Sequence, residues 1–246
     1  MNKVYIYGKH AVLDAVTLAP HVVDKVFVEP DQHEEIDRLA KKRGIFRSPF
    51  NERVLEKKLG EHAVHQGVAA IIDTEKLVQD FSALEALLDP EKQHALVLLG
   101  EVQDPQNVGS IIRSAAAFGV SAVLIPKDRQ AQITGSVIKA SVGTAFRVPI
   151  IGIGNVNQSV RALKERHFWI YGLSGDTEET RSKNIRDEDF SENTVFIVGN
   201  ESTGIREKTS EYCDQILTIP ISEQVDSLNA GTSAAIAFYE WSSKQK

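Results

Sequence analysis

Three polar clusters in this sequence each follow an apolar run. The first, DPQNVGSIIRSAAAFG, predicts a helix over 108–118 in which Arg113 lies opposite the apolar stripe, beside Gly109 and Ser110. A guanidinium with such small neighbours could hold a phosphate or polarise a hydroxyl group, because its charge is permanent and a ligand can approach it. The alternative interpretation is a solvated arginine on a helix that Asn107 caps.

The second cluster is VGNESTGI. Gly199 ends an apolar run and Gly204 begins a predicted helix, so the backbone must turn sharply around Glu201. Phosphate-binding loops rely on backbone amides and a lysine, so a carboxylate here suits a cationic or hydrogen-donating ligand instead. A helix-capping pair formed by Asn200 and Glu201 is the alternative.

The third cluster lies in IPISEQVDSLNAGTSAAIAFYEW. A strand is expected to end at Pro220, and after a polar loop Ser227, Leu228 and Asn229 are expected to begin a helix over about 226–242. The small residues from Ala230 to Ala237 permit close backbone packing, which would serve a knot, a core or a subunit interface. A Ser/Asp N-cap before an ordinary core helix explains the same residues.

Alternating strands and helices are predicted to carry these clusters. Strands are expected at 95–102, 122–126, 146–151, 167–172, 194–199 and 216–220, and helices at 108–118, 133–141, 156–166, 206–213 and 226–242. This alternation predicts a parallel α/β sheet. Since ligands bind beyond the carboxyl ends of such strands, the three clusters should converge at one edge.

The front of the chain predicts a smaller unit. Strands are expected at 4–7, 25–28 and 68–72, and helices at 10–18 and 34–43. The charged, Pro-containing stretch 75–94 is interpreted as a linker, which gives domains at 1–74 and 95–246. A basic cluster, either a solvated face or an RNA backbone contact, lies on and after the second helix: Arg38, Lys41, Lys42, Arg43 and Arg47.

Composition excludes several classes of protein. The 246 residues include 28 Lys and Arg against 34 Asp and Glu, and the net charge of −6 argues against indiscriminate coating of nucleic acid. Cys213 is the single cysteine, so neither an intrachain disulfide nor a cysteine-rich zinc site is possible, and no motif for another metal is present. No apolar run is long enough for a membrane span, and polar residues interrupt the start of the chain, so it has no signal-peptide apolar region. With a single cysteine, a protein of the reducing cytoplasm is expected. The segment GIGN lacks the GxGxxG pattern, which leaves a nicotinamide oxidoreductase as a weak alternative.

Together, the three clusters resemble the ordered motifs of the SpoU branch of the SPOUT RNA methyltransferases, over about residues 95–241. The front segment, which opens with IYGKHAVLDAV and closes with HQGVAAI, resembles that family's small ribosomal-protein-like substrate-binding domain. This pairing is most similar to bacterial enzymes that 2′-O-methylate a guanosine of 23S ribosomal RNA. A tRNA methyltransferase of the same family and a non-catalytic RNA-binding relative are the alternatives.

The resemblance implies a fold, a cofactor and roles for particular residues. The fold would be a parallel sheet whose C-terminal segment makes a deep trefoil knot, which binds S-adenosyl-L-methionine in a bent shape and pairs two subunits. The implied catalytic residues are Asn107, Arg113, Glu201, Ser227 and Asn229, and the implied cofactor contacts are Gly199, Asn200, Ile219 and Leu228. The sequence departs from the usual motifs at Ser202, at 222–224 and at 230–231.

Overall fold

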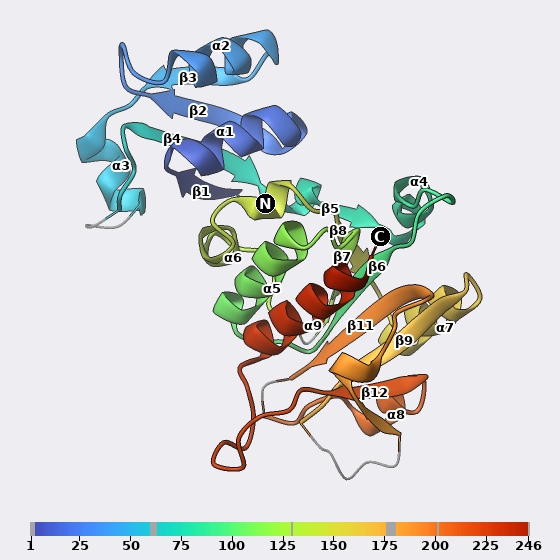
Figure 1. The fold of residues 1–246 in the computed structure, drawn as a ribbon. Coiled ribbons are helices and arrows are strands. Elements are labelled where there is room, and N and C mark those ends of the chain that lie inside the picture. Colours follow the sequence, from blue (N-terminus) through green and yellow to red (C-terminus); the bar gives the residue numbers. More distant parts are fainter. Residues whose placement is uncertain (1–2, 60–62, 129, 176–180, 201, 246) are drawn as a thin grey trace.

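The structure, a computed structural model, describes residues 3–59, 63–128, 130–175, 181–200 and 202–245. Its strands form two sheets, and the front of the chain makes the smaller one (Figure 1). The smaller sheet has the order β1 (Lys3–Tyr7), β4 (Val68–Asp73), β2 (Val23–Val28) and β3 (Phe46–Pro49). Its helices are α1 (Lys9–Leu18), α2 (Glu34–Lys42) and α3 (Glu52–Leu59). The β2–β3 pair is parallel, and the other two pairs are antiparallel.

The larger sheet is parallel at every neighbouring pair that the structure describes, which confirms the predicted parallel α/β architecture. Its strands run in the order β10 (Ser182–Asn184), β12 (Gln215–Thr218), β9 (Phe168–Leu173), β11 (Asn193–Gly199), β6 (Ala95–Gly100), β7 (Ala122–Pro126), β8 (Ile150–Ile153) and β5 (Val78–Asp80). Its helices are α4 (Leu84–Leu87), α5 (Pro105–Ala117), α6 (Gly135–Ala140), α7 (Val156–Lys164), α8 (Glu207–Ser210) and α9 (Ala230–Lys244). Short 3-10 turns lie at Pro20–Val22, Thr74–Leu77, Phe81–Ala83, Thr144–Phe146 and Ile185–Asp187.

Strand β6 shows why the larger sheet needs helices on both faces. Val97 and Leu99 pack into one hydrophobic cluster with residues of α5 and α9, whereas Leu96 and Leu98 pack into a second cluster with residues of α7. All four side chains are fully buried. Successive side chains of a strand point to opposite faces, so a continuous apolar run fits a strand that is covered on both sides.

Several element boundaries differ from the prediction. The strand expected at 146–151 begins at Ile150, because Thr144–Phe146 forms a 3-10 turn. The last helix begins at Ala230 rather than near 226. The stretch 75–94 contains β5, whose pairing with β8 makes it the edge strand of the larger sheet. The expected domain boundaries of 1–74 and 95–246 stay a prediction.

None of the helices in the described ranges combines the length and the apolar character that a membrane span requires.

Candidate active site

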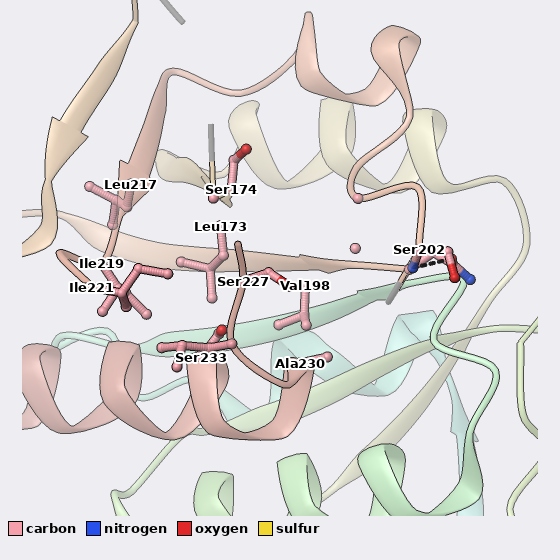
Figure 2. Close-up of a pocket in the computed structure, with 15 residues that line it drawn as sticks. Leu173, Ser174, Val198, Ser202, Leu217, Ile219, Ile221, Ser227, Ala230 and Ser233 are labelled. Carbon is pink, nitrogen blue, oxygen red and sulfur yellow. Dashed lines mark hydrogen bonds between the residues drawn. The ribbon is translucent and has the colours of Figure 1, made fainter. Parts of the chain in front are cut away.

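A cavity of about 250 Å³ lies beyond the carboxyl ends of β9, β11 and β12 (Figure 2). It contains five of the residues that sequence analysis associated with the site: Gly199, Asn200, Ile219, Ser227 and Leu228. Its other lining residues are Leu173, Ser174, Gly175, Val198, Ser202, Gly204, Leu217, Ile221, Ala230 and Ser233. The structure therefore brings the second and third polar clusters together at one edge of the sheet.

The lining of this cavity is uncharged throughout the described residues. Aliphatic side chains such as Val198, Leu217 and Ile219 form part of the wall, and the hydroxyl groups of Ser227 and Ser233 add polar atoms on the side of α9. Pockets that are largely apolar with a few polar groups bind small organic ligands, whose aromatic or aliphatic parts contact the walls. The cavity therefore suits an organic cofactor with both apolar and polar parts, the polar parts being oriented by backbone and hydroxyl hydrogen bonds.

The turn after β11 is closed by its own backbone. Asn200 and Gly204 exchange two backbone hydrogen bonds, with N···O distances of 3.0 and 2.9 Å. A Cβ atom on Gly199 would lie 2.3 Å from the carbonyl carbon of Gly204, so a side chain cannot fit at that position without opening the turn. Glu201, the carboxylate predicted inside this turn, lies outside the described residues.

The Asn200 side chain ties this turn to the loop after β6. Its Oδ1 accepts hydrogen bonds from the backbone N–H groups of Ser202 and Thr203, and its Nδ2 donates to the carbonyl oxygen of Glu101 at 2.9 Å. Helix α8 begins only at Glu207, so the interpretation of Asn200 as part of a helix cap is wrong. Its contacts stabilise the turn that forms one wall of the cavity.

The alternative interpretation in which Asn107 caps the first motif's helix is also wrong. Asp104 is the N-cap of α5, with its carboxylate accepting from the backbone N–H of Gln106 at 2.9 Å, and Pro105 occupies the first helical position. Proline is well suited to that position because an N–H group there would have no acceptor within the helix, so its absence loses no hydrogen bond. Asn107 lies inside the helix and is 6% exposed. Its side-chain amide contacts Asn229, at the start of α9.

Asn229 joins the start of α9 to α5. Its Oδ1 caps α9 by accepting from the backbone N–H groups of Gly231 and Thr232, at 2.9 and 3.2 Å. Its Nδ2 donates to Oδ1 of Asn107 at 2.7 Å. The cap is therefore Asn229 itself, rather than the preceding Ser or Asp, and two residues 122 positions apart are linked beside the cavity.

Small residues let three helices approach closely at this place. A Cβ atom on Gly231 would lie 2.8 Å from Oγ of Ser110, and one on Gly109 would lie 2.3 Å from Cβ of Ala140. Helix α5 therefore packs against α9 on one side and against α6 on the other. Ala234 and Ala237 are fully buried, so the small residues of α9 serve core packing.

Arg113 lies one turn after Gly109 on α5, and its side chain is exposed. It does not line the cavity, and it forms no hydrogen bond or ion pair with the residues that the structure describes. Val108, Ile111, Ile112 and Ala115 of the apolar stripe opposite it are buried, as predicted, whereas Phe118 at its end is half-buried. The guanidinium is thus not used in holding the described fold together, which leaves its donors available to a ligand.

The basic residues predicted as RNA contacts lie elsewhere, on and after α2 in the smaller sheet's unit. Arg38, Lys41, Lys42 and Arg43 are all exposed. A hollow beside them is lined by Arg38 and Lys41 together with acidic side chains, among them Glu34 and Asp37. This surface therefore carries charges of both signs.

Strand β9 contributes a wall of the cavity that the sequence did not predict, at Leu173, Ser174 and Gly175. The segment is an apolar strand followed by a Gly/Ser turn, like the other strand ends, but it carries no distinctive polar residue. Its importance comes from the strand order, because β9 lies between β11 and β12. Cys213 is buried, as expected for a core residue, and the part of the chain that the structure describes contains no cluster of metal-binding side chains.

Replacing Asn229 with alanine is expected to lower the free energy of unfolding by about 1–3 kcal/mol. The loss combines the N-cap of α9 with the donor to buried Asn107. Asn229→Asp keeps a cap acceptor but removes that donor, so it should fall between wild type and Asn229→Ala. Urea unfolding followed by circular dichroism measures all three; equal stabilities would contradict this role for Asn229.

Two family profiles match the chain. That of the SpoU rRNA Methylase family covers residues 94–239, and one described as RNA 2′-O ribose methyltransferase substrate binding covers residues 5–78. Proteins named 23S rRNA (guanosine-2′-O-)-methyltransferase RlmB are similar over nearly the whole chain. That of Xylella fastidiosa is 36% identical over 98% of this chain and 97% of its own. That of Escherichia coli strain K12 is 33% identical over 96% of each chain.

Solved structures share the fold. An AdoMet-bound rRNA methyltransferase from Sinorhizobium meliloti has a TM-score of 0.81 at 23% identity, covering 98% of this chain and 87% of that one. The SpoU methyltransferase AviRb from Streptomyces viridochromogenes, in complex with AdoMet, has a TM-score of 0.80 at 19% identity, covering 99% of this chain and 90% of that one. Both sequence and fold agree with the motifs at the cavity, and the chain belongs to the SpoU rRNA Methylase family.

Proposed function

We propose that this protein transfers a methyl group from S-adenosyl-L-methionine to a ribose 2′-hydroxyl of RNA, with a guanosine of 23S rRNA as the target. The observation that carries the proposal is the convergence of the second and third motifs on one uncharged cavity, with Asn229 linking it to the first. The similar proteins named for that reaction support the choice of substrate. Membership of this family leaves no support for the nicotinamide oxidoreductase alternative.

The cavity residues fit this cofactor. Leu173, Val198 and Ile219 offer apolar surface for an adenine ring, and the backbone of the turn at Gly199, where a Cβ atom has no room, lines the cavity beside them. Leu228 lies in the third motif, directly before the Asn229 cap. Gly199, Asn200, Ile219 and Leu228 are therefore the residues that would hold the cofactor.

The cofactor supplies a methyl group that its sulfonium already activates. The chain must then align the 2′-oxygen with that methyl group and help to remove the hydroxyl proton. Arg113 contacts the target ribose and its phosphate, where its positive charge lowers the pKa of the 2′-hydroxyl or assists a proton relay through the phosphate. Since a guanidinium stays protonated, it acts as a charge and donor rather than as a free base.

The remaining catalytic candidates position the reacting groups. Asn107 and Asn229 hold α5 and α9 together through their amide hydrogen bond, which orients Arg113 relative to the cavity. Ser227 offers a hydroxyl group at the cavity wall for the substrate. In this proposal Glu201, which belongs to the second motif, is also a positioning residue.

The proposal includes a trefoil knot and a homodimer. The chain leaves β12, which lies near one end of the sheet, and returns through the third-motif loop to α9, which packs on α5. Exposed apolar side chains on this loop and on α9 support a second copy of the chain as the partner: Ile221, Val225 and Tyr239. A crystal structure in which the C-terminal segment is not threaded through a loop would contradict the knot. A monomer mass in sedimentation equilibrium would contradict the homodimer.

The function is tested by methyl transfer from radiolabelled cofactor to unmodified 23S rRNA and to unmodified tRNA transcripts. We expect label in 23S rRNA, at a guanosine whose 2′-O-methylation blocks alkaline cleavage of the adjacent bond. Label in tRNA alone would show that tRNA, rather than 23S rRNA, is the substrate. Binding of RNA with no label and no cofactor binding in calorimetry would identify a non-catalytic relative.

A further inference from the structure

A second cavity, of about 460 Å³, lies between the front unit and the larger sheet's unit. From the front unit it is lined by the end of β1, the start of α1 and the end of α3, and from the other unit by α6 and the turn after it. We call this cavity the interdomain cleft. Figure 1 shows α6 next to β1, where the two units meet.

The two units are held together beside this cleft. Arg147 donates two hydrogen bonds to the carboxylate of Asp14, at 2.7 and 2.8 Å, across the junction. A Cβ atom on Gly143 would lie 2.9 Å from Cα of Ala11, so the backbones of the two units are in close contact. Packing between the two units therefore fixes the walls of the cleft, and its shape depends on both units.

The charge of the cleft is opposite to that of the chain. Its described lining residues include Lys9, His10, Lys58 and Lys139 and no Asp or Glu, although the chain has 34 acidic residues against 28 Lys and Arg. None of these four side chains forms an ion pair with a described residue. Unpaired lysines on both walls make a site for anions such as phosphates.

Aromatic and exposed apolar side chains lie among these charges. Tyr7 lines the cleft, and Nζ of Lys139 lies 5.8 Å from the centroid of its ring. Val142 also lines it, is 53% exposed and has a backbone φ of 53°. A β-branched residue with that φ is strained, and strained positions are frequent at ligand clamps. Stacking surfaces next to cations are the combination that binds single-stranded nucleic acid.

We propose that the interdomain cleft binds a single-stranded segment of the RNA substrate, with Lys9, Lys58 and Lys139 on phosphates and Tyr7 stacked on a base. This inference rests on the proposed function, which supplies the RNA. Helix α6 connects the cleft to the reaction site, because its other side packs on Gly109 of α5, one turn before Arg113. The cleft is also better suited to RNA than the α2 surface, where Glu34 and Asp37 lie among the basic residues.

The test compares two charge reversals of equal size in the full-length protein. One variant combines Lys9→Glu, Lys58→Glu and Lys139→Glu; its matched control combines Lys41→Glu, Lys42→Glu and Arg43→Glu on the α2 surface. The probe is an unmodified 23S rRNA transcript in filter binding over a range of salt concentrations. We expect the cleft variant to bind the RNA at least tenfold more weakly. The slope of the logarithm of its binding constant against the logarithm of the salt concentration should be smaller in magnitude by about 2, because each phosphate contact to a single strand contributes about 0.7 to that slope. The α2 variant should lose less.

Cofactor binding in calorimetry separates this inference from the proposed reaction. The cleft variant should bind S-adenosyl-L-methionine like wild type, which also shows that it folds. Tyr7→Leu should weaken RNA binding about tenfold, whereas Tyr7→Phe should retain it, because stacking requires only the ring. Unchanged RNA affinity of the cleft variant, or a larger loss in the α2 variant, would overturn the inference. A wild-type protein that binds RNA through the cleft without methylating it would contradict the reaction and support the cleft.

Discussion

Replacing Arg113 with alanine is expected to lower the single-turnover rate of methyl transfer by about 100- to 10,000-fold, the range over which groups that assist proton transfer contribute. The structure gives no reason for a loss of stability, because this exposed side chain forms no hydrogen bond or ion pair with the described residues. The cavity should also bind S-adenosyl-L-methionine normally, since Arg113 does not line it. Rapid-quench measurement with radiolabelled cofactor and saturating RNA gives the rate of the chemical step.

Arg113→Lys is the matched variant. It keeps the positive charge but loses the planar set of donors that holds ribose and phosphate together, so it should recover part of the rate. Recovery to the wild-type rate would show that charge alone suffices. Near-normal turnover of Arg113→Ala, with intact cofactor affinity, would remove this side chain from the proposed mechanism.

Much of the architecture could be predicted because burial leaves a periodic pattern. The apolar run at 95–102 predicted a strand buried on both faces of the sheet, and the side chains from Ala95 to Leu99 divide between the two hydrophobic clusters. The convergence of the second and third polar clusters followed from a general property of parallel sheets, that ligands bind beyond the carboxyl ends of strands. Gly199, Ile219 and Ser227 do line one cavity there.

The remaining details depend on contacts between distant segments. Asn107 looked like a helix cap because its neighbours in the sequence allow that role, but Asp104 and Pro105 begin the helix three residues earlier. Its actual partner, Asn229, lies 122 residues away. The wall at Leu173 and Ser174 depends on β9 lying between β11 and β12, an order that local periodicity does not determine.

The same limitation applies to the interdomain cleft. Lys9, Lys58 and Lys139 are far apart in the sequence and belong to three different helices. The basic cluster on and after α2 was visible because its residues are adjacent in the sequence, yet acidic side chains accompany it in space. The sequence therefore identified the basic surface on α2, whose residues are neighbours along the chain. The basic lining of the interdomain cleft, which has no acidic residue among its described residues, forms only when the chain folds.

Replacing Gly199 with alanine is expected to weaken S-adenosyl-L-methionine binding by about 10- to 100-fold, as calorimetry would measure. The added Cβ atom would lie 2.3 Å from the carbonyl carbon of Gly204, which is backbone and cannot rotate away. Overpacking of this kind typically costs about 1–3 kcal/mol, and the turn must open to relieve it. The opening would move the Asn200 backbone and Gly204, both of which line the cavity.

Gly119→Ala is the control, because it adds the same methyl group at a glycine that does not line the cavity. A Cβ atom there meets no atom within 4 Å, so the cost is limited to the left-handed backbone, with φ of 75°. That strain is worth about 1 kcal/mol and needs no movement of the cavity wall. We therefore expect Gly119→Ala to bind the cofactor within a few-fold of wild type. Equal affinities of the two variants would mean that close packing at Gly199 does not shape the cofactor site, and the proposal would lose the backbone wall on which cofactor binding depends.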